Sequence, residues 1–273
     1  PLVVTGDSVN FKGNNNTSFN RSGFSGVTFK VSNVDNCNMG HFMVDGQRSV
    51  VGGTVGFAVE NCSNSKFSFI KTKNTGTLGQ YYISGVDSIG FENTHVHGCK
   101  AEDSGVSGIQ MQGCRSSGMS SCSSKRLNLD GTGVGTGVYF KVPAEDCYHT
   151  NNYAEDVVVA FSTGSSYPGS IAKNITFSNG RAKNVSAVLR LGESNGCTFN
   201  GLTGSITASP VTGLGDGIRY EGGAINNTVT GFSITGVASS RAAARHLGNA
   251  SGNRTEVASF RAPQTNALLA SFE

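Results

Sequence analysis

Three aspartates recur at nearly constant spacing in the middle of the chain. Asp103, Asp130 and Asp156 are separated by almost equal intervals, and Glu102 and Glu155 belong to repeated Ala-Glu-Asp triplets that end at the first and third of them. If the backbone returns to the same side of the molecule at that interval, these carboxylates stack on neighbouring turns, roughly 5 Å apart. Repulsion between stacked carboxylates raises the pKa of one of them and supplies a general acid. We therefore predict Asp103, Asp130, Glu102 and Asp156 as catalytic groups for glycosidic hydrolysis.

The same aspartates have a structural alternative. Asp103 precedes Ser and Asp130 precedes Gly, and an aspartate in such a turn commonly accepts a hydrogen bond from its own backbone. A third Ala-Glu-Asp triplet ends at Asp146. The pattern leaves the catalytic and the structural interpretation open.

A second set of side chains falls at alternate positions of short apolar segments. If the apolar residues of each segment point inward, their neighbours point outward. Aromatic rings stack on sugar faces, and amide and guanidinium groups bond hydroxyls and carboxylates. A solvent-facing strand is also polar without any ligand, which is the alternative. The predicted substrate-binding residues are Tyr82, Gln110, Gln112, Tyr139, Lys141, Arg190, Arg219 and Glu221.

Two histidines could supply a base or a metal pair. His95 and His97 are predicted to point outward from one strand, with Glu92 nearby. A histidine pair on an exposed strand more often has neither role. The Cys and His spacings do not match a zinc site, and the chain has no acidic glycine-rich nonapeptide typical of structural calcium. We expect no metal and no cofactor.

The elements that would position these residues repeat at a period of about 27 residues, which is in the range of solenoid repeats. GVTFKV at 26–31 and GVYFKV at 137–142 differ at one residue and are separated by four such periods. After each such strand comes a turn, often with Asn, and a second strand. A repeat of this length that holds only strands and turns predicts a coil of parallel β-structure. A leucine-rich repeat would need a leucine framework, and a propeller would need a four-strand period. We predict an all-β, right-handed, single-stranded parallel β-helix of about nine rungs of ~27 residues.

Composition agrees with this fold and argues against several functions. Glycine accounts for 38 of 273 residues and charged residues for 14%, which suits short strands and tight turns. The net charge of +3, with no basic cluster denser than Lys125-Arg126, argues against nucleic acid as a partner. The longest apolar run, Val157 to Phe161, is far shorter than the ~20 residues that cross a membrane. We expect no membrane insertion.

The seven cysteines are odd in number, and most occupy similar places in the repeat. This placement predicts small buried side chains rather than disulfides, and free thiols favour assembly in a reducing compartment. The cysteines that follow Asn, Gly or Asp at similar places in the repeat include Cys37, Cys62, Cys114, Cys147 and Cys197.

In architecture the chain resembles the right-handed parallel β-helix family that includes pectate lyases and, more closely, bacteriophage tailspikes. The resemblance covers residues 24–260. GIRYEG at 217–222 is similar to the Arg-x-Lys strand of polygalacturonases, but Tyr220 replaces the lysine and no Asp-Asp or Gly-His-Gly motif accompanies it. That catalytic site is therefore not transferred. Uneven rung lengths, free cysteines and the lack of a visible signal peptide favour the phage branch.

The tailspike resemblance implies a function and a location. A tailspike is a homotrimer of the virion tail that is assembled in the host cytoplasm and acts at the host surface. It binds, and often cleaves, a bacterial surface polysaccharide, either capsule or lipopolysaccharide O-antigen. We expect the β-helix at 24–260, preceded by a truncated lead-in at 1–23. A tail at 261–273 would lead to a missing or separate region.

Several mechanisms remain open. Hydrolysis by paired carboxylates is preferred to β-elimination, which would use Tyr82, Tyr139, Lys141 or Arg219 as base and charge stabiliser. The first alternative is a non-catalytic receptor-binding or structural shaft. The second is a secreted pectate-lyase-like enzyme or epimerase.

Overall fold

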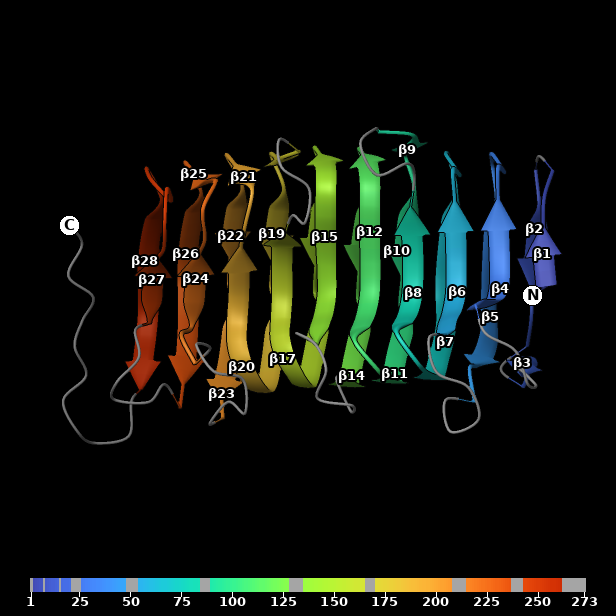
Figure 1. The fold of residues 1–273 in the computed structure, drawn as a ribbon, viewed down its shortest axis with the longest axis horizontal. Helices are drawn as coiled ribbons and strands as arrows, with labels where there is room; N and C mark the ends of the chain where they lie inside the picture. Colours follow the sequence, from blue (N-terminus) through green and yellow to red (C-terminus); the bar gives the residue numbers. More distant parts are fainter. Residues whose placement is uncertain are drawn as a thin grey trace.

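The chain forms one continuous coil of parallel β-strands. The computed structural model describes residues 2–6, 8–14, 16–20, 26–47, 54–83, 89–127, 135–164, 170–207, 215–236 and 243–261. Every regular element in these ranges is a strand, and successive turns run side by side along the long axis, from β1 and β2 at one end to β27 and β28 at the other (Figure 1). The predicted all-β parallel β-helix is confirmed, with about eight turns of ~28 residues. In this part of the chain no helix is long and apolar enough to cross a membrane.

The longest strands stack into one column, which we call face A. β15 pairs with β12 before it and with β17 after it, always in parallel. Valine and phenylalanine fill its inward positions, as suits a pleated, half-buried strand. Face A contains the second halves of β17 (Tyr153–Gly164) and β20 (Arg181–Leu191), together with β1 (Leu2–Val4), β4 (Gly26–Ser32), β6 (Thr54–Glu60), β8 (Leu78–Ile83), β9 (Phe91–Glu92), β12 (Ser107–Arg115), β15 (Thr136–Glu145), β18 (Ala172–Lys173), β21 (Ser194–Asn195), β24 (Ile218–Tyr220), β25 (Ala224–Ile225) and β27 (Ala244–His246).

Two further columns complete each turn, and we call them faces B and C. Face B contains the first halves of β5 (Asn38–Asp45), β7 (Lys66–Thr75), β26 (Thr228–Thr235) and β28 (Arg254–Arg261), with β2 (Asn10–Lys12), β10 (His95–His97), β13 (Gly118–Ser120), β16 (Tyr148–Thr150), β19 (Thr176–Ser178) and β22 (Thr198–Asn200). Face C contains the second halves of those four long strands, the first halves of β17 and β20, and β3 (Ser18–Asn20), β11 (Lys100–Ser104), β14 (Ser123–Leu127) and β23 (Thr203–Ile206).

The described part of residues 2–20 also belongs to the coil. Its strands β1, β2 and β3 pair with β4 and β5, so parallel pairing begins before the predicted boundary at residue 24. The predicted tail, 261–273, lies outside the described residues except for its first residue.

Residues in the left-handed backbone conformation turn the chain from one face to the next. Asparagine and aspartate adopt this conformation more readily than other non-glycine residues because their short side chains bond locally. At the corner between faces A and B the side chains also bond from rung to rung, as from Asn61 Nδ2 to Asn33 Oδ1 (3.2 Å) and from Asn174 Nδ2 to Asp146 Oδ1 (3.1 Å). This explains the many asparagines in the turns of the repeat.

A column of buried rings fills the interior. Phe67 packs against Tyr82 with ring centroids 5.5 Å apart, and Phe177 stacks between His149 (4.3 Å) and Phe199 (4.7 Å). All seven cysteines are buried and unbridged, which confirms the prediction made from their placement. The main core is thus continuous along the coil.

The predicted alternation is wrong by one residue in β8. Tyr82, predicted to face outward, is completely buried, whereas Ile83 is only partly buried. Gln80 determines which side chains of β8 point inward, because its Nε2 donates to the backbone oxygens of Ile70 and Lys100 (2.9 Å each). The Tyr82 hydroxyl in turn donates to Gln80 Oε1 at 2.9 Å. A satisfied polar pair therefore lies inside the core, and Tyr82 is unable to contact a ligand on face A.

Burial of His149 makes stability depend on pH. The surroundings lower its pKa from 6.5 to about 3, so it is neutral in the folded chain while the unfolded chain takes up a proton below pH 6.5. Above pH 6.5 His149 does not lower the free energy of unfolding. As the pH falls from 6.5 toward 3, this free energy decreases by about 1.4 kcal/mol per pH unit. His149→Phe, which keeps the ring stack, should show a smaller decrease in unfolding free energy between pH 7 and 4.5 in urea titrations. Equal slopes for His149→Phe and the wild type would contradict this assignment.

Candidate functional site on face A

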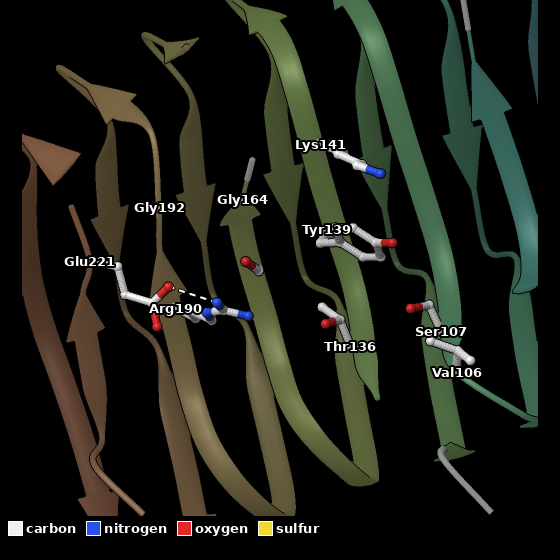
Figure 2. A pocket seen from close by; sticks show the side chains of 10 residues that line it. Val106, Ser107, Thr136, Tyr139, Lys141, Gly164, Arg190, Gly192 and Glu221 are labelled. Atoms are coloured by element: carbon white, nitrogen blue, oxygen red, sulfur yellow. Dashed lines mark hydrogen bonds and ion pairs between the residues drawn. The ribbon is translucent and has the colours of Figure 1, made fainter. Parts of the chain in front are cut away.

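A cavity of about 230 Å³ lies on the outer side of face A. It extends over the rungs of β12, β15, β17, β20 and β24, and Figure 2 shows its lining side chains rising from these neighbouring strands. Glycines at two positions leave room for it. The lining residues are Val106, Ser107, Thr136, Tyr139, Lys141, Ser162, Gly164, Arg190, Gly192 and Glu221.

Tyr139 is the aromatic wall of this cavity, and buried amides hold it. Its hydroxyl donates to Gln110 Oε1, and Gln110 Nε2 donates to Gln112 Oε1 at 3.0 Å. The Tyr81 hydroxyl donates to the same Gln112 oxygen at 3.2 Å. Burial raises the pKa of Tyr139 well above its usual value. The ring is therefore fixed in place by an ordered network.

Gln110 and Gln112 were predicted to face a ligand, and this part of the prediction is wrong. They lie on the outer side of β12 as expected, but their exposures are 3% and 0% because neighbouring side chains, including the two tyrosines, cover them. They can position Tyr139 but do not reach the cavity surface.

The charged end of the cavity carries more positive than negative groups. Arg190 Nη2 lies 2.7 Å from Glu221 Oε2, and Arg219 Nε lies 3.0 Å from Glu221 Oε1. In Figure 2 another guanidinium nitrogen of Arg190 points toward the open space near Thr136. Lys141 lies beyond the Tyr139 ring on the same outer side, and burial lowers its pKa. Among the described lining residues, Lys141 and Arg190 outnumber the one carboxylate, Glu221, and this balance favours an anionic ligand.

The predicted catalytic aspartates lie elsewhere, at the corner between faces C and A. Register places Lys125 beside Glu102 and Leu127 beside Ser104, so the residue next to Asp103 is Arg126. Asp130, expected at that place, lies outside the described residues.

Arg126 reverses the predicted electrostatics. Its Nε and Nη2 donate to the two carboxylate oxygens of Asp103 at 2.7 and 2.9 Å, and this bond holds the pKa of Asp103 below its usual value. On the next rung, Asp156 accepts a hydrogen bond from Asn184 Nδ2 at 3.1 Å. The prediction of stacked carboxylates is therefore wrong for the described part of this corner, and the prediction of a raised pKa is wrong for Asp103.

The Ala-Glu-Asp triplet is explained by the corner itself. In both Ala101-Glu102-Asp103 and Ala154-Glu155-Asp156 the alanine is buried and the aspartate adopts the left-handed conformation, with φ of 55° and 54°. The glutamate between them points outward. The structural interpretation of the triplet thus accounts for all three residue types.

The outward glutamates belong to a column of alternating charges on face C, which we call the charge ladder. Glu155 Oε atoms lie 2.8 Å from Lys125 Nζ and from Lys183 Nζ, and these bonds lower its pKa to about 2. Glu102 bonds Lys71 at 2.9 Å. The register of the ladder, rung by rung, is Asp45, Lys73, Glu102, Lys125, Glu155 and Lys183.

The two outward histidines of β10 do not form a metal site. His95 Nδ1 lies 3.0 Å from the Tyr148 hydroxyl, and His97 Nδ1 lies 2.9 Å from Ser120 Oγ. Within the described ranges no group of three or more His, Cys, Asp or Glu side chains could hold a metal ion.

Sequence reasoning found four of the lining residues, namely Tyr139, Lys141, Arg190 and Glu221, and missed others. Ser162 pairs in register with Tyr139 and Arg190, but it follows the apolar run Val157 to Phe161, whose alternation cannot be read. Gly164 and Gly192 contribute space rather than a functional group. Arg219, also predicted, is not among the lining residues and contacts Glu221 instead.

Comparisons with known structures identify the fold. Protein-family models give no match, and neither do curated protein sequences. The tailspike protein of E. coli bacteriophage HK620 in complex with a pentasaccharide matches with a TM-score of 0.65 and 18% identity over 93% of this chain and 52% of that one. A double mutant of that tailspike, also with pentasaccharide, matches with a TM-score of 0.68 and 17% identity over 97% and 56%.

The fold matches the β-helix of the HK620 tailspike. A second double mutant of the HK620 tailspike, with a TM-score of 0.65 and 16% identity over 93% of this chain and 52% of that one, agrees. The chain spans about half the length of these tailspikes. At this identity the comparison concerns the architecture alone.

The corner aspartates should tolerate loss of charge. Asp103→Asn removes one partner of an exposed ion pair, which is worth at most about 1 kcal/mol, and leaves Glu102 within 3.5 Å of Arg126. We expect urea titrations to show a change of that size. Asp146→Asn, in the third triplet, is the matched control. If the chain has a polysaccharide-cleaving activity and Asp103→Asn abolishes it without loss of stability, the predicted catalytic role of this corner is restored.

Proposed function

We propose that this chain is the polysaccharide-binding β-helix of a phage tailspike. The observation that carries the proposal is the face A cavity, where a fixed tyrosine ring and an arginine lie in one column along the axis of the coil and a lysine lies beside the tyrosine on the same strand. The HK620 tailspikes with this architecture were solved with bound oligosaccharides. The full protein would be a trimer of the virion tail that meets capsule or O-antigen at the host surface.

The direction of the cavity suits a chain of sugars. Its lining residues come from five successive rungs, and strands on neighbouring rungs are ~4.8 Å apart. One rung therefore matches about one sugar residue, and the cavity can follow several residues of a polysaccharide. The Tyr139 ring would stack on a sugar face, while Arg190 and Lys141 would bond hydroxyls and carboxylates.

A second candidate function is cleavage of the bound chain, favoured by the lowered pKa of Lys141. Hydrolysis needs two carboxylates, but Glu221 is the one carboxylate among the described lining residues, and two arginines bond it. At this cavity the residues present fit β-elimination better, provided that the substrate contains a uronate.

In that reaction the neutral Lys141 amine removes the proton at C5 of the uronate. The electron pair of the C5–H bond forms the C4=C5 double bond, the C4–O bond breaks, and the leaving oxygen takes up a proton from Tyr139 or water. Arg190 would balance the negative charge that develops at the uronate carboxylate.

Binding should depend on the cavity side chains. Arg190→Gln and Tyr139→Ala are expected to weaken binding of an acidic capsule or O-antigen polysaccharide at least tenfold, because each removes a contact worth more than about 1.4 kcal/mol. Isothermal titration calorimetry on a panel of purified polysaccharides measures this. Arg181→Gln, which changes an exposed arginine on face C, should bind as the wild type does. Equal affinities for all variants would place the polysaccharide elsewhere.

Cleavage is read from its products. New reducing ends together with absorbance near 235 nm mean elimination, whereas reducing ends without that absorbance mean hydrolysis. We expect elimination that Lys141→Met abolishes while polysaccharide binding persists, with Lys173→Met as the control. Activity should rise with pH as Lys141 loses its proton, in a range below the usual lysine pKa of 10.5. Binding with neither product would identify an adhesin.

A further inference from the structure

Phe69 occupies a position that folding alone does not explain. It lies at the corner between faces B and C with φ of 54°, a left-handed conformation that is costly for a bulky side chain. Its side chain is 49% exposed, so it contributes little to the core. The later corners of the same column use residues suited to this conformation: Gly98, Ser121, Asn151, Asn179, Gly201 and Gly231.

The neighbouring rungs are shaped around this ring. Gly98, on the next rung, adopts φ of 62°, and a Cβ atom there would lie 2.6 Å from the Phe69 ring. The ring therefore lies directly over Gly98. His41 on the preceding rung packs with its centroid 4.9 Å from the ring of Phe69, and His97 meets it edge-on at 5.3 Å. Two imidazoles and a glycine thus hold an exposed aromatic platform.

Two cavities of about 240 Å³ lie on either side of Phe69, and His41 lines both. One contains Lys12 and Lys66, and the other contains Lys71 and Lys100. No carboxylate among the described residues lines either cavity. Lys71 pairs with Glu102, whereas the other three lysines form no ion pair with any described residue. The patch is therefore cationic and aromatic, and Lys71 joins it to the charge ladder at Glu102.

We propose that this patch is a second saccharide subsite, selective for a sugar residue that carries a carboxylate. The exposed ring offers a stacking surface for a sugar face, which a simple inorganic anion would not use. The lysines supply charge for the carboxylate. Self-association is disfavoured because it would bring the lysines of two copies together. Nucleic acid is disfavoured because successive bases of a strand stack on several aromatic side chains, whereas this patch has one exposed aromatic ring. The ligand class rests on the proposed function, but the site is on another face of the coil.

Histidine signals give a direct readout, because the chain has five histidines. In a chain labelled with ¹³C at the histidine rings, galacturonate added to tens of millimolar should shift the His41 and His97 signals saturably. Galactose should shift them at least fivefold less. Phe69→Asn, which suits the left-handed corner, should abolish the galacturonate shift with an unfolding midpoint equal to or above that of the wild type. Tyr148→Ser, which changes another exposed aromatic residue on face B, should alter the His95 signal alone.

Other outcomes overturn the proposal. Absence of a shift with both galacturonate and glucuronate, or an equal shift in Phe69→Asn, rules out the subsite. A response to inorganic phosphate as strong as that to galacturonate means general anion binding. A tighter response to oligothymidylate assigns the patch to nucleic acid, and a shift on dilution of the protein alone assigns it to self-association. Arg190→Gln should leave the galacturonate response intact, so loss of polysaccharide binding on face A and loss of this subsite are separate results.

Discussion

The parallel hydrogen-bond register between successive turns determines almost every other feature of this molecule. Each strand pairs with its counterpart one turn of ~28 residues away, so a side chain at one place in the repeat lies directly above the equivalent side chain on the next turn. Core rings, corner asparagines, cavity side chains and ladder charges are all columns generated by this one constraint. A column can therefore change its chemistry from rung to rung while the backbone repeats, as face A does where Gln110 is followed by Tyr139, Ser162 and Arg190.

The sequence was enough to predict the fold because its signals agree at several levels. Short strands alternate apolar and polar residues, turns carry asparagine, and the length of the repeat allows a parallel coil. Four of the cavity residues were found for the same reason: in β15, β20 and β24 the alternation is clean, so the outward side chains can be identified. The burial of the cysteines could be predicted because they come directly after a corner residue.

Other features depend on pairing that a count along the sequence does not reveal. Turns differ in length, so spacing placed Asp130 beside Asp103, whereas register places Arg126 there, on a shorter turn. In β8 the buried Gln80 bonds two backbone oxygens of distant segments, and this contact sets which of two adjacent tyrosines points inward. In the run Val157 to Phe161 every residue is apolar, and Val158 and Val159 pack with Ala187 in a cluster separate from the main core.

The charge ladder has a consequence for how the coil assembles. Its signs alternate over six rungs, so each inner turn of the ladder meets opposite charge on both neighbours when the turns stack in order. A chain that skipped the turn of Glu102 would bring Lys73 against Lys125, and one that skipped the turn of Lys125 would bring Glu102 against Glu155. Backbone hydrogen bonds do not distinguish one turn from another, since every turn offers the same donors and acceptors. The charges of the ladder do distinguish the turns, and they therefore disfavour a coil in which one turn has been skipped.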